Sequence, residues 1–282
     1  MNLLTVVNHP AALLEKAESM LLVNEAKNNL MLGLLYQAHK AETGLENYFF
    51  AYAELEDEMR MAFIKTPNKN LIIASGGPIS EEFLEDVIAE LLQLNLSIPG
   101  IVGERTLAND FATVWTKKTG KKLVVDVEQL IYQLDVVNEE RIGSGVMRLA
   151  GVQDLDTISQ WIYDFAKVTP DLLTPEVARQ KAEDDVNSQT IYLWTLNNSV
   201  VSMAKEARPT NNGVVVTLVF TPEEYRGMGY ASSLVASLSK HLLEEGYKFC
   251  SLYTDLANPT SNHIYREIGY YQISESIMYS FK

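Results

Sequence analysis

The stretch that decides the fold is residues 214–246, which read VVVTLVFTPEEYRGMGYASSLVASLSKHLLEEG. Its first seven residues are almost all apolar, which predicts a strand buried on both faces over Val214–Phe220. From Ala231 to Glu245 the apolar residues recur at helical spacing, so we expect an amphipathic helix that ends at Gly246. A glycine-containing loop, Arg226-Gly227-Met228-Gly229-Tyr230-Ala231, joins the strand to the helix.

A loop that leads from a strand into a helix presents free backbone N–H groups at the positive end of the helix dipole. Gly227 and Gly229 leave room for a phosphate to approach the backbone, and Arg226 adds positive charge. The loop is not a Walker motif, because no Gly-Lys-Ser/Thr follows it, and it lacks the third glycine of a dinucleotide fingerprint. We therefore predict an anion site on the backbone of residues 227–232, although two glycines alone are more often a plain turn.

A second motif follows at residues 258–270, NPTSNHIYREIGY. Asn258 is placed to cap a helix whose first residue is Pro259. Tyr265 lies seven residues after Asn258, about two helical turns later and on roughly the same face. Taken alone, such a pattern is more often just a helix cap and a packed aromatic ring.

These two motifs together resemble the GNAT superfamily of N-acetyltransferases. The pyrophosphate loop of that family reads Arg or Gln, two residues, Gly, one residue, then Gly or Ala, and Arg226, Gly229 and Ala231 fill those places. The family also has an asparagine followed three residues later by a small residue and seven later by a tyrosine, as do Asn258, Ser261 and Tyr265. The wider string of residues 219–231 is similar to a bacterial group of predicted acetyltransferases with a degenerate amino-terminal half. The detailed resemblance covers about residues 146–282.

The resemblance implies a binding site for acetyl-coenzyme A. The cofactor would lie across the strands Val214–Phe220 and Phe249–Tyr253, with Asn258 in contact with it. Its pantetheine would pair with the backbone of Leu218, Val219 and Phe220 as an added strand would. Its pyrophosphate would bind the loop and the backbone amides that follow, those of Gly227, Met228, Gly229, Tyr230, Ala231 and Ser232.

The implied activity is transfer of an acetyl group to a primary amine by direct attack in a ternary complex. The resemblance places Tyr265 at the sulfur, where a hydroxyl with an ordinary pKa of about 10 can protonate the leaving thiolate. We expect the backbone amide of Phe220 to stabilise the oxyanion. The base stays open between water and three carboxylates, those of Glu206, Glu224 and Asp255. Two other functions stay open: a coenzyme A-binding regulatory protein without catalysis, and an acyltransferase with a different acyl donor.

Composition narrows the remaining choices. The chain has 282 residues and a formal net charge of −14, with no basic stripe, so nucleic acid is not an expected partner. Its single cysteine, Cys250, and four scattered histidines predict no disulfide and no metal site. We see no leader peptide and no apolar run long enough for a bilayer, so we expect a cytoplasmic protein without membrane contact. The expected acceptor is a small-molecule or peptide amine, in a pocket that Trp161, Tyr192 and Trp194 are candidates to line. The sequence is also compatible with a homodimer.

The length and the repeated order of elements predict an α/β (α+β) fold with two GNAT-like halves. Each half would be a mixed, mainly antiparallel sheet flanked by helices, and only the C-terminal copy would carry the cofactor site. In the first half the strand Leu71–Ala74 runs into Gly76-Gly77-Pro78 without the arginine-glycine loop. We predict domains at 1–138 and 145–282, joined by a polar linker at 137–145 that could pack on the sheet. We also expect a helix over Glu25–Ala38 and two closing strands within Tyr270–Phe281.

Overall fold

The computed structural model describes residues 3–41, 43–167 and 173–282. Contacts divide the chain into two compact units: unit 1 comprises residues 1–131 and 273–282, and unit 2 comprises residues 132–272. Two long strands, β6 (Leu123–Leu134) and β12 (Tyr271–Phe281), contribute residues to both units. The predicted domain limits of 1–138 and 145–282 remain a prediction. The contacts place residues 273–282 in unit 1 because β12 pairs antiparallel with β5 (Gly100–Glu104).

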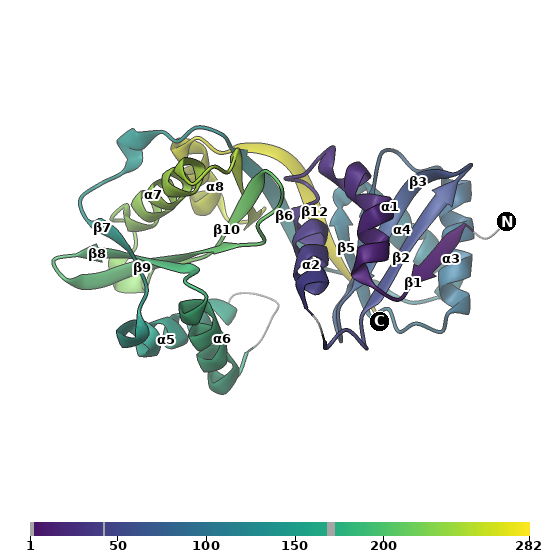
Figure 1. Cartoon of the computed structure of the whole chain (residues 1–282), viewed down its shortest axis with the longest axis horizontal. Coiled ribbons are helices and arrows are strands. Elements are labelled where there is room, and N and C mark those ends of the chain that lie inside the picture. Colours follow the sequence, from purple (N-terminus) through teal and green to yellow (C-terminus); the bar gives the residue numbers. More distant parts are fainter. Residues whose placement is uncertain (1–2, 42, 168–172) are drawn as a thin grey trace. The chain divides into compact units, whose positions relative to one another are not determined.

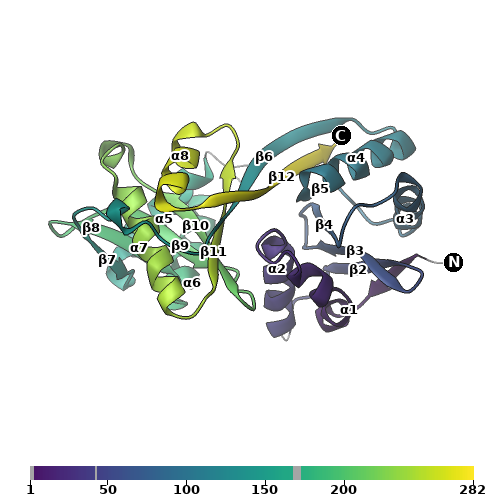
Figure 2. The same cartoon turned by 90° about the horizontal axis from the view of Figure 1, so that it is seen from above.

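Unit 1 is a mixed sheet with helices on both faces (Figure 2). Its strand order is β1-β2-β3-β4-β5-β12-β6. Strands β4 and β5 pair in parallel, whereas β1–β2, β2–β3, β3–β4 and β5–β12 pair antiparallel. Besides β5 and the long strands, its elements are β1 (Leu4–Val7), α1 (Pro10–Leu22), α2 (Asn29–Lys40), β2 (Phe49–Leu55), β3 (Glu58–Lys65), β4 (Leu71–Ser75), α3 (Glu81–Gln93) and α4 (Arg105–Thr119).

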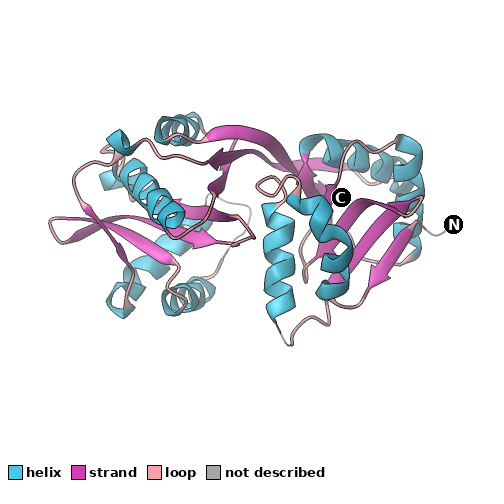
Figure 3. Cartoon of the chain, turned by 45° about the horizontal axis from the view of Figure 1, so that its top comes forward, coloured by secondary structure: helices cyan, strands magenta, loops and turns pink. Residues whose placement is uncertain are grey.

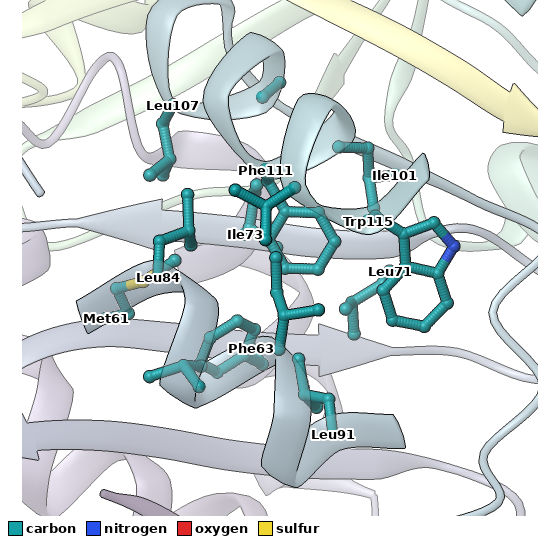
Figure 4. Close-up of a cluster of buried hydrophobic side chains, with 14 of the residues drawn as sticks. Met61, Phe63, Leu71, Ile73, Leu84, Leu91, Ile101, Leu107, Phe111 and Trp115 are labelled. Atoms are coloured by element: carbon teal, nitrogen blue, oxygen red, sulfur yellow. The ribbon is translucent and has the colours of Figure 1, made fainter. Parts of the chain in front are cut away.

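The core of unit 1 has one layer on each face of its sheet. Side chains of α3 and α4, such as Leu84 and Phe111, pack on Phe63 and Ile73 of the strands (Figure 4). Helices α1 and α2 cover the other face. Successive residues of each strand therefore point into one layer and then the other. This explains why residues 61–64 of β3 and 71–74 of β4 are all apolar.

Unit 2 repeats this plan. Helices α5 and α6 lie on one side of strands β8 and β9, and α7 and α8 on the other (Figure 1). The strand order is β6-β11-β10-β9-β8-β7, with β10 and β11 parallel. The elements are η1 (Glu139–Arg141), β7 (Val146–Leu149), η2 (Val152–Asp154), α5 (Leu155–Ala166), α6 (Pro175–Asn187), β8 (Ile191–Leu196), β9 (Ser199–Ala207), β10 (Gly213–Phe220), η3 (Glu223–Tyr225), α7 (Tyr230–Glu244), β11 (Phe249–Asp255) and α8 (Pro259–Ile268).

The predicted fold class is thus confirmed, and helices and strands alternate along both halves (Figure 3). Three details of the prediction are wrong. Strand β1 was missed, and the C-terminal segment is one strand, β12, rather than two. Helix α2 begins at Asn29 instead of Glu25, because the side-chain amides of Asn28 and Asn29 donate to backbone carbonyls of the preceding turns.

The polar segment at 137–145 packs within unit 2 along α7 and α8. The backbone N–H of Gly143 donates to the hydroxyl of Ser233 at 2.9 Å, and Lys240 of α7 pairs with Glu139 at 2.6 Å. Arg141 forms an ion pair with Glu267 of α8. The sequence left open whether this segment packs on the rest of the domain, and in the structure it packs against α7 and α8. No helix in the described part of the chain combines the length and apolar character needed to cross a bilayer.

The buried carboxylate of Asp154, just before α5, pairs with Arg148 of β7. Asp154 is only 6% exposed and accepts two hydrogen bonds from Arg148, at 2.7 and 2.8 Å, and one from the N–H of Gly151 at 2.9 Å. The hydrogen bonds from Arg148 lower the pKa of Asp154 below its usual value. Because the folded state favours the charged carboxylate, its stabilisation is present above the unfolded pKa and is lost as pH falls through the folded pKa.

We expect Asp154→Asn to lower the free energy of unfolding at pH 7 by about 2 kcal/mol, since a charged, buried hydrogen-bond acceptor is removed. Urea denaturation at pH 7 and at about pH 3 measures this, and the difference from wild type should shrink in acid. Asp156→Asn is the control, because the exposed Asp156 pairs with Arg179 at the surface. A similar loss in both variants at pH 7 would contradict the assignment.

Candidate functional site

The site is organised by two neighbouring strands that stop pairing. The parallel ladder between β10 and β11 covers Gly213–Val215 and Phe249–Ser251, although the two strands continue to Phe220 and Asp255. On the other side of β10, the register with β9 shifts between Thr217 and Phe220. The backbone of Leu218 lies in the left-handed region, with φ 52°, which marks a bulge. The last residues of β10 therefore have backbone groups that the sheet does not use in a regular ladder.

The loop after β10 carries the glycines into α7. Gly227 and Gly229 have φ of 74° and 79°, a conformation that favours glycine. A Cβ atom built on either would meet no heavy atom within 4 Å, so the space above both residues is open. Helix α7 has no side chain capping its N-terminus and no acidic residue in its first turn. Its first N–H groups thus face the loop without a side-chain acceptor, which fits a phosphate group.

The corresponding helix of unit 1, α3, is closed to an anion. Ser80 accepts a hydrogen bond from the N–H of Phe83, and Glu81 and Glu82 occupy the first turn. A Cβ atom on Gly76, in the loop before α3, would lie 2.8 Å from the side chain of Met20. The two halves therefore share an architecture, but unit 1 satisfies its helix N-terminus internally and places negative charge there.

Two further contacts hold the loop. The Nε of Arg226 donates to the carbonyl of Thr221 at 3.0 Å, which turns the guanidinium back toward the end of β10. The buried hydroxyl of Ser233 lies 3.0 Å from the carbonyl of Gly229. The site predicted from the sequence ends at Ser232 and does not include Ser233. Its role depends on residues 141–143, which lie about 90 positions away, so no local pattern indicates it.

Asn258 and Tyr265 lie on α8, which packs against α7 and follows β11. The Asn258 side chain is exposed and accepts from the N–H of Ser261 at 3.0 Å, so it caps the helix. Tyr265 is buried between the rings of Tyr132 and Tyr270, at centroid distances of 6.5 and 6.0 Å. Burial raises the pKa of Tyr265 to about 12. Among the described residues none forms a hydrogen bond with this hydroxyl, so it stays protonated at neutral pH and has a proton to donate.

The three candidate bases are not brought together. Glu206 pairs in register with Val216, and its carboxyl group lies near Tyr192 and His241, toward the C-terminal end of α7 and away from the glycine loop. Burial raises the pKa of Glu206. Glu224 is exposed, and Asp255 accepts from the N–H of Ala257 within its own turn. These positions favour none of the carboxylates as a base.

The positions of Cys250 and of the three aromatic candidates show which of them lie near the proposed site. Cys250 is fully buried, its Sγ lies 3.7 Å from the carbonyl of Ser239, and burial raises its pKa to about 12. This thiol is therefore no nucleophile at neutral pH. Trp161 packs against Phe220 at 5.8 Å between ring centroids, whereas Tyr192 contacts His241 on α7 and Trp194 is buried. Only Trp161 of the three touches the end of β10.

Comparisons with known proteins match part of the sequence to a family model and the fold to solved structures. The family model described as FR47-like protein matches residues 196–279, the segment from the end of β8 to the end of β12. This segment includes the bulged strand, the glycine loop and α8. Comparison with curated protein sequences found no match.

Several solved structures share the fold over nearly the whole chain. A GNAT-family acetyltransferase from Colwellia psychrerythraea is 12% identical, with a TM-score of 0.59 and coverage of 99% of both chains. A GCN5-related N-acetyltransferase from Sphaerobacter thermophilus is 12% identical, with a TM-score of 0.62, over 98% of this chain and 94% of that one. A Drosophila protein is 10% identical, with a TM-score of 0.69 over 99% of both chains.

The fold is that of these solved GNAT-type proteins, as the resemblance stated from the sequence implied. Within that class, residues 196–279 are FR47-like. In the described part of the chain no group of three or more His, Cys, Asp or Glu side chains is arranged to hold a metal ion.

The glycine loop can be tested with two matched variants. We expect Gly229→Val to weaken binding of acetyl-coenzyme A at least about tenfold, because the side chain would occupy the open space at the start of α7 and strain the loop. Gly246→Val is the control: Gly246 also has a positive φ, 108°, with nothing within 4 Å, but it lies after the other end of α7. Calorimetric titration measures both affinities, and thermal melting compares the cost of the strain. Equal loss of affinity in the two variants would show that the loop is not the binding site.

Proposed function

We propose that the protein is an acetyl-coenzyme A-dependent N-acetyltransferase that moves an acetyl group to a primary amine by direct attack in a ternary complex. The observation that carries the proposal is the N-terminus of α7, which follows Gly229 and has no side-chain cap. It comes after β10, a bulged strand whose pairing with β11 ends before its last residues. One part offers donors to phosphate, and the other offers a free strand end to an amide-containing chain.

The residues that would hold the cofactor come from the end of β10, the glycine loop and the start of α8. The pyrophosphate would bind the amides of residues 227–232, where Gly227 and Gly229 leave open space. The pantetheine would pair with the backbone of Leu218, Val219 and Phe220, beyond Val215, where the pairing of β10 with β11 ends. Asn258 would contact the cofactor from the start of α8, where its side chain is exposed.

Acetyl-coenzyme A supplies an activated thioester carbonyl. In the proposed reaction the neutral amine forms the new C–N bond, the C–S bond breaks, and the amine proton passes to water or to a base that we do not assign. The Phe220 N–H would donate to the carbonyl oxygen as it gains charge. Tyr265 would give its proton to the departing sulfur, which its raised pKa allows because the hydroxyl remains protonated. Since the only thiol is buried, direct attack is preferred to an acyl-enzyme.

Titration with acetyl-coenzyme A in a calorimeter, without any amine, tests the binding step. We expect one site per chain with micromolar affinity, because α3 of unit 1 is capped by Ser80 and carries acidic residues. Absence of binding at about 1 mM ligand would refute the proposal, provided that binding stays absent when candidate amines are added. Two sites per chain would contradict the closed state of unit 1.

Tyr265→Phe should lower turnover at least about tenfold while the affinity for acetyl-coenzyme A stays within about twofold, because the hydroxyl acts only as sulfur leaves. Steady-state kinetics at saturating amine measure the first quantity and calorimetry the second. Tyr132→Phe is the matched control, since Tyr132 is a buried neighbour of the same ring. If turnover of Tyr265→Phe stays within about twofold of wild type, another group is the acid. Parallel assays with acetyl, succinyl and longer acyl donors determine the acyl preference.

A further inference from the structure

A buried serine on β9 stands out among apolar neighbours. Ser202 is fully buried in the run Val200-Val201-Ser202-Met203-Ala204. A hydroxyl group in such a place costs free energy unless it forms hydrogen bonds. The Ser202 Oγ lies 3.0 Å from the carbonyl oxygen of Phe220 and 2.9 Å from the Oγ1 of Thr221. Its single proton is donated to the carbonyl, so it accepts the proton of the Thr221 hydroxyl.

These bonds fall where the ladder of the sheet is interrupted. The register of β9 and β10 resumes at Met203 and Phe220, after the bulge at Leu218. The chain then leaves the sheet at Thr221. A bulged strand end next to a turn has few backbone partners of its own, so the Ser202 hydroxyl restrains the backbone of Phe220 and the side chain of Thr221 together.

The same hydrogen bonds continue into the glycine loop. The carbonyl of Thr221 accepts from the Nε of Arg226 at 3.0 Å. A chain of contacts thus runs from Ser202, through Thr221, to the first residue of the loop motif. It joins the strand end that would hold the acyl group to the loop that would hold the pyrophosphate.

We infer that Ser202 is a positioning residue for acetyl transfer, which fixes the end of β10 so that the Phe220 N–H keeps a set place relative to the glycine loop. The inference rests on the proposed function for its catalytic consequence. Ser202 touches neither substrate nor cofactor, and it acts through Phe220 and Thr221. A small displacement of an oxyanion donor lowers turnover more than it lowers ground-state binding.

Ser202→Ala tests the inference, with Ser251→Ala as the matched control. Ser251 of β11 is also a fully buried serine, but its hydroxyl has no hydrogen-bond partner among the described residues, so its removal leaves no group unpaired. We expect Ser202→Ala to lower turnover about tenfold with the affinity for acetyl-coenzyme A within about twofold of wild type. Amide hydrogen exchange in residues 216–221 of the free protein should rise in Ser202→Ala and not in Ser251→Ala.

Thr221→Val provides a second variant that keeps the shape of the side chain and removes the hydroxyl. Its effect on turnover should not add to that of Ser202→Ala in the double variant, because both changes break the same pair. If Ser202→Ala does not fold, Thr221→Val alone tests the restraint, because it should also raise amide exchange in residues 216–221.

Unchanged turnover together with faster exchange would overturn the catalytic role. Unchanged exchange at 216–221 would overturn the restraint itself, as would equal losses in Ser202→Ala and Ser251→Ala. If wild type neither binds acetyl-coenzyme A nor acetylates any amine, the proposed function fails, and the exchange experiment still decides whether Ser202 restrains the strand end.

Discussion

Backbone pairing between β10 and β11 ends after Val215, and everything proposed for this protein depends on that end. A parallel pair normally satisfies its own N–H and C=O groups along its full length. On the other side of β10, the bulge at Leu218 shifts its register with β9. The last residues of β10 therefore retain backbone groups for another partner. The glycine loop follows at once and delivers the chain into α7 with an uncapped N-terminus. Strand end and helix start therefore belong to one continuous piece of chain.

The two halves of the chain share an architecture and differ at the N-terminus of one helix, α3 in unit 1 and α7 in unit 2. Both use a mixed sheet with a parallel pair of strands followed by a helix. In unit 1 a serine caps the helix, two glutamates add negative charge, and a methionine side chain lies against the loop glycine. In unit 2 the same place is open, and its glycines have positive φ. The difference lies in a few side chains at one helix terminus and not in the architecture.

Two buried serines of unit 2, Ser202 and Ser233, hold backbone in place. Ser202 bonds to the end of β10, and Ser233 joins the start of α7 to the segment that precedes β7. Each satisfies backbone groups that a bulge or helix start leaves without a ladder partner. Tyr265 differs from both, since its hydroxyl lacks such a partner among the described residues while its ring is firmly packed.

The sequence by itself determined the fold class, the glycine loop and the helix cap at Asn258, because each depends on residues close together in the chain. It also indicated the class of protein through the loop motif. Tertiary structure alone decided where pairing stops between β10 and β11, that β12 is a single strand pairing with β5, and that Glu206 lies away from the loop. The contacts of Ser202 and Ser233 join residues about 20 and 90 positions apart. Such contacts follow from strand register and packing between elements, which local spacing does not encode.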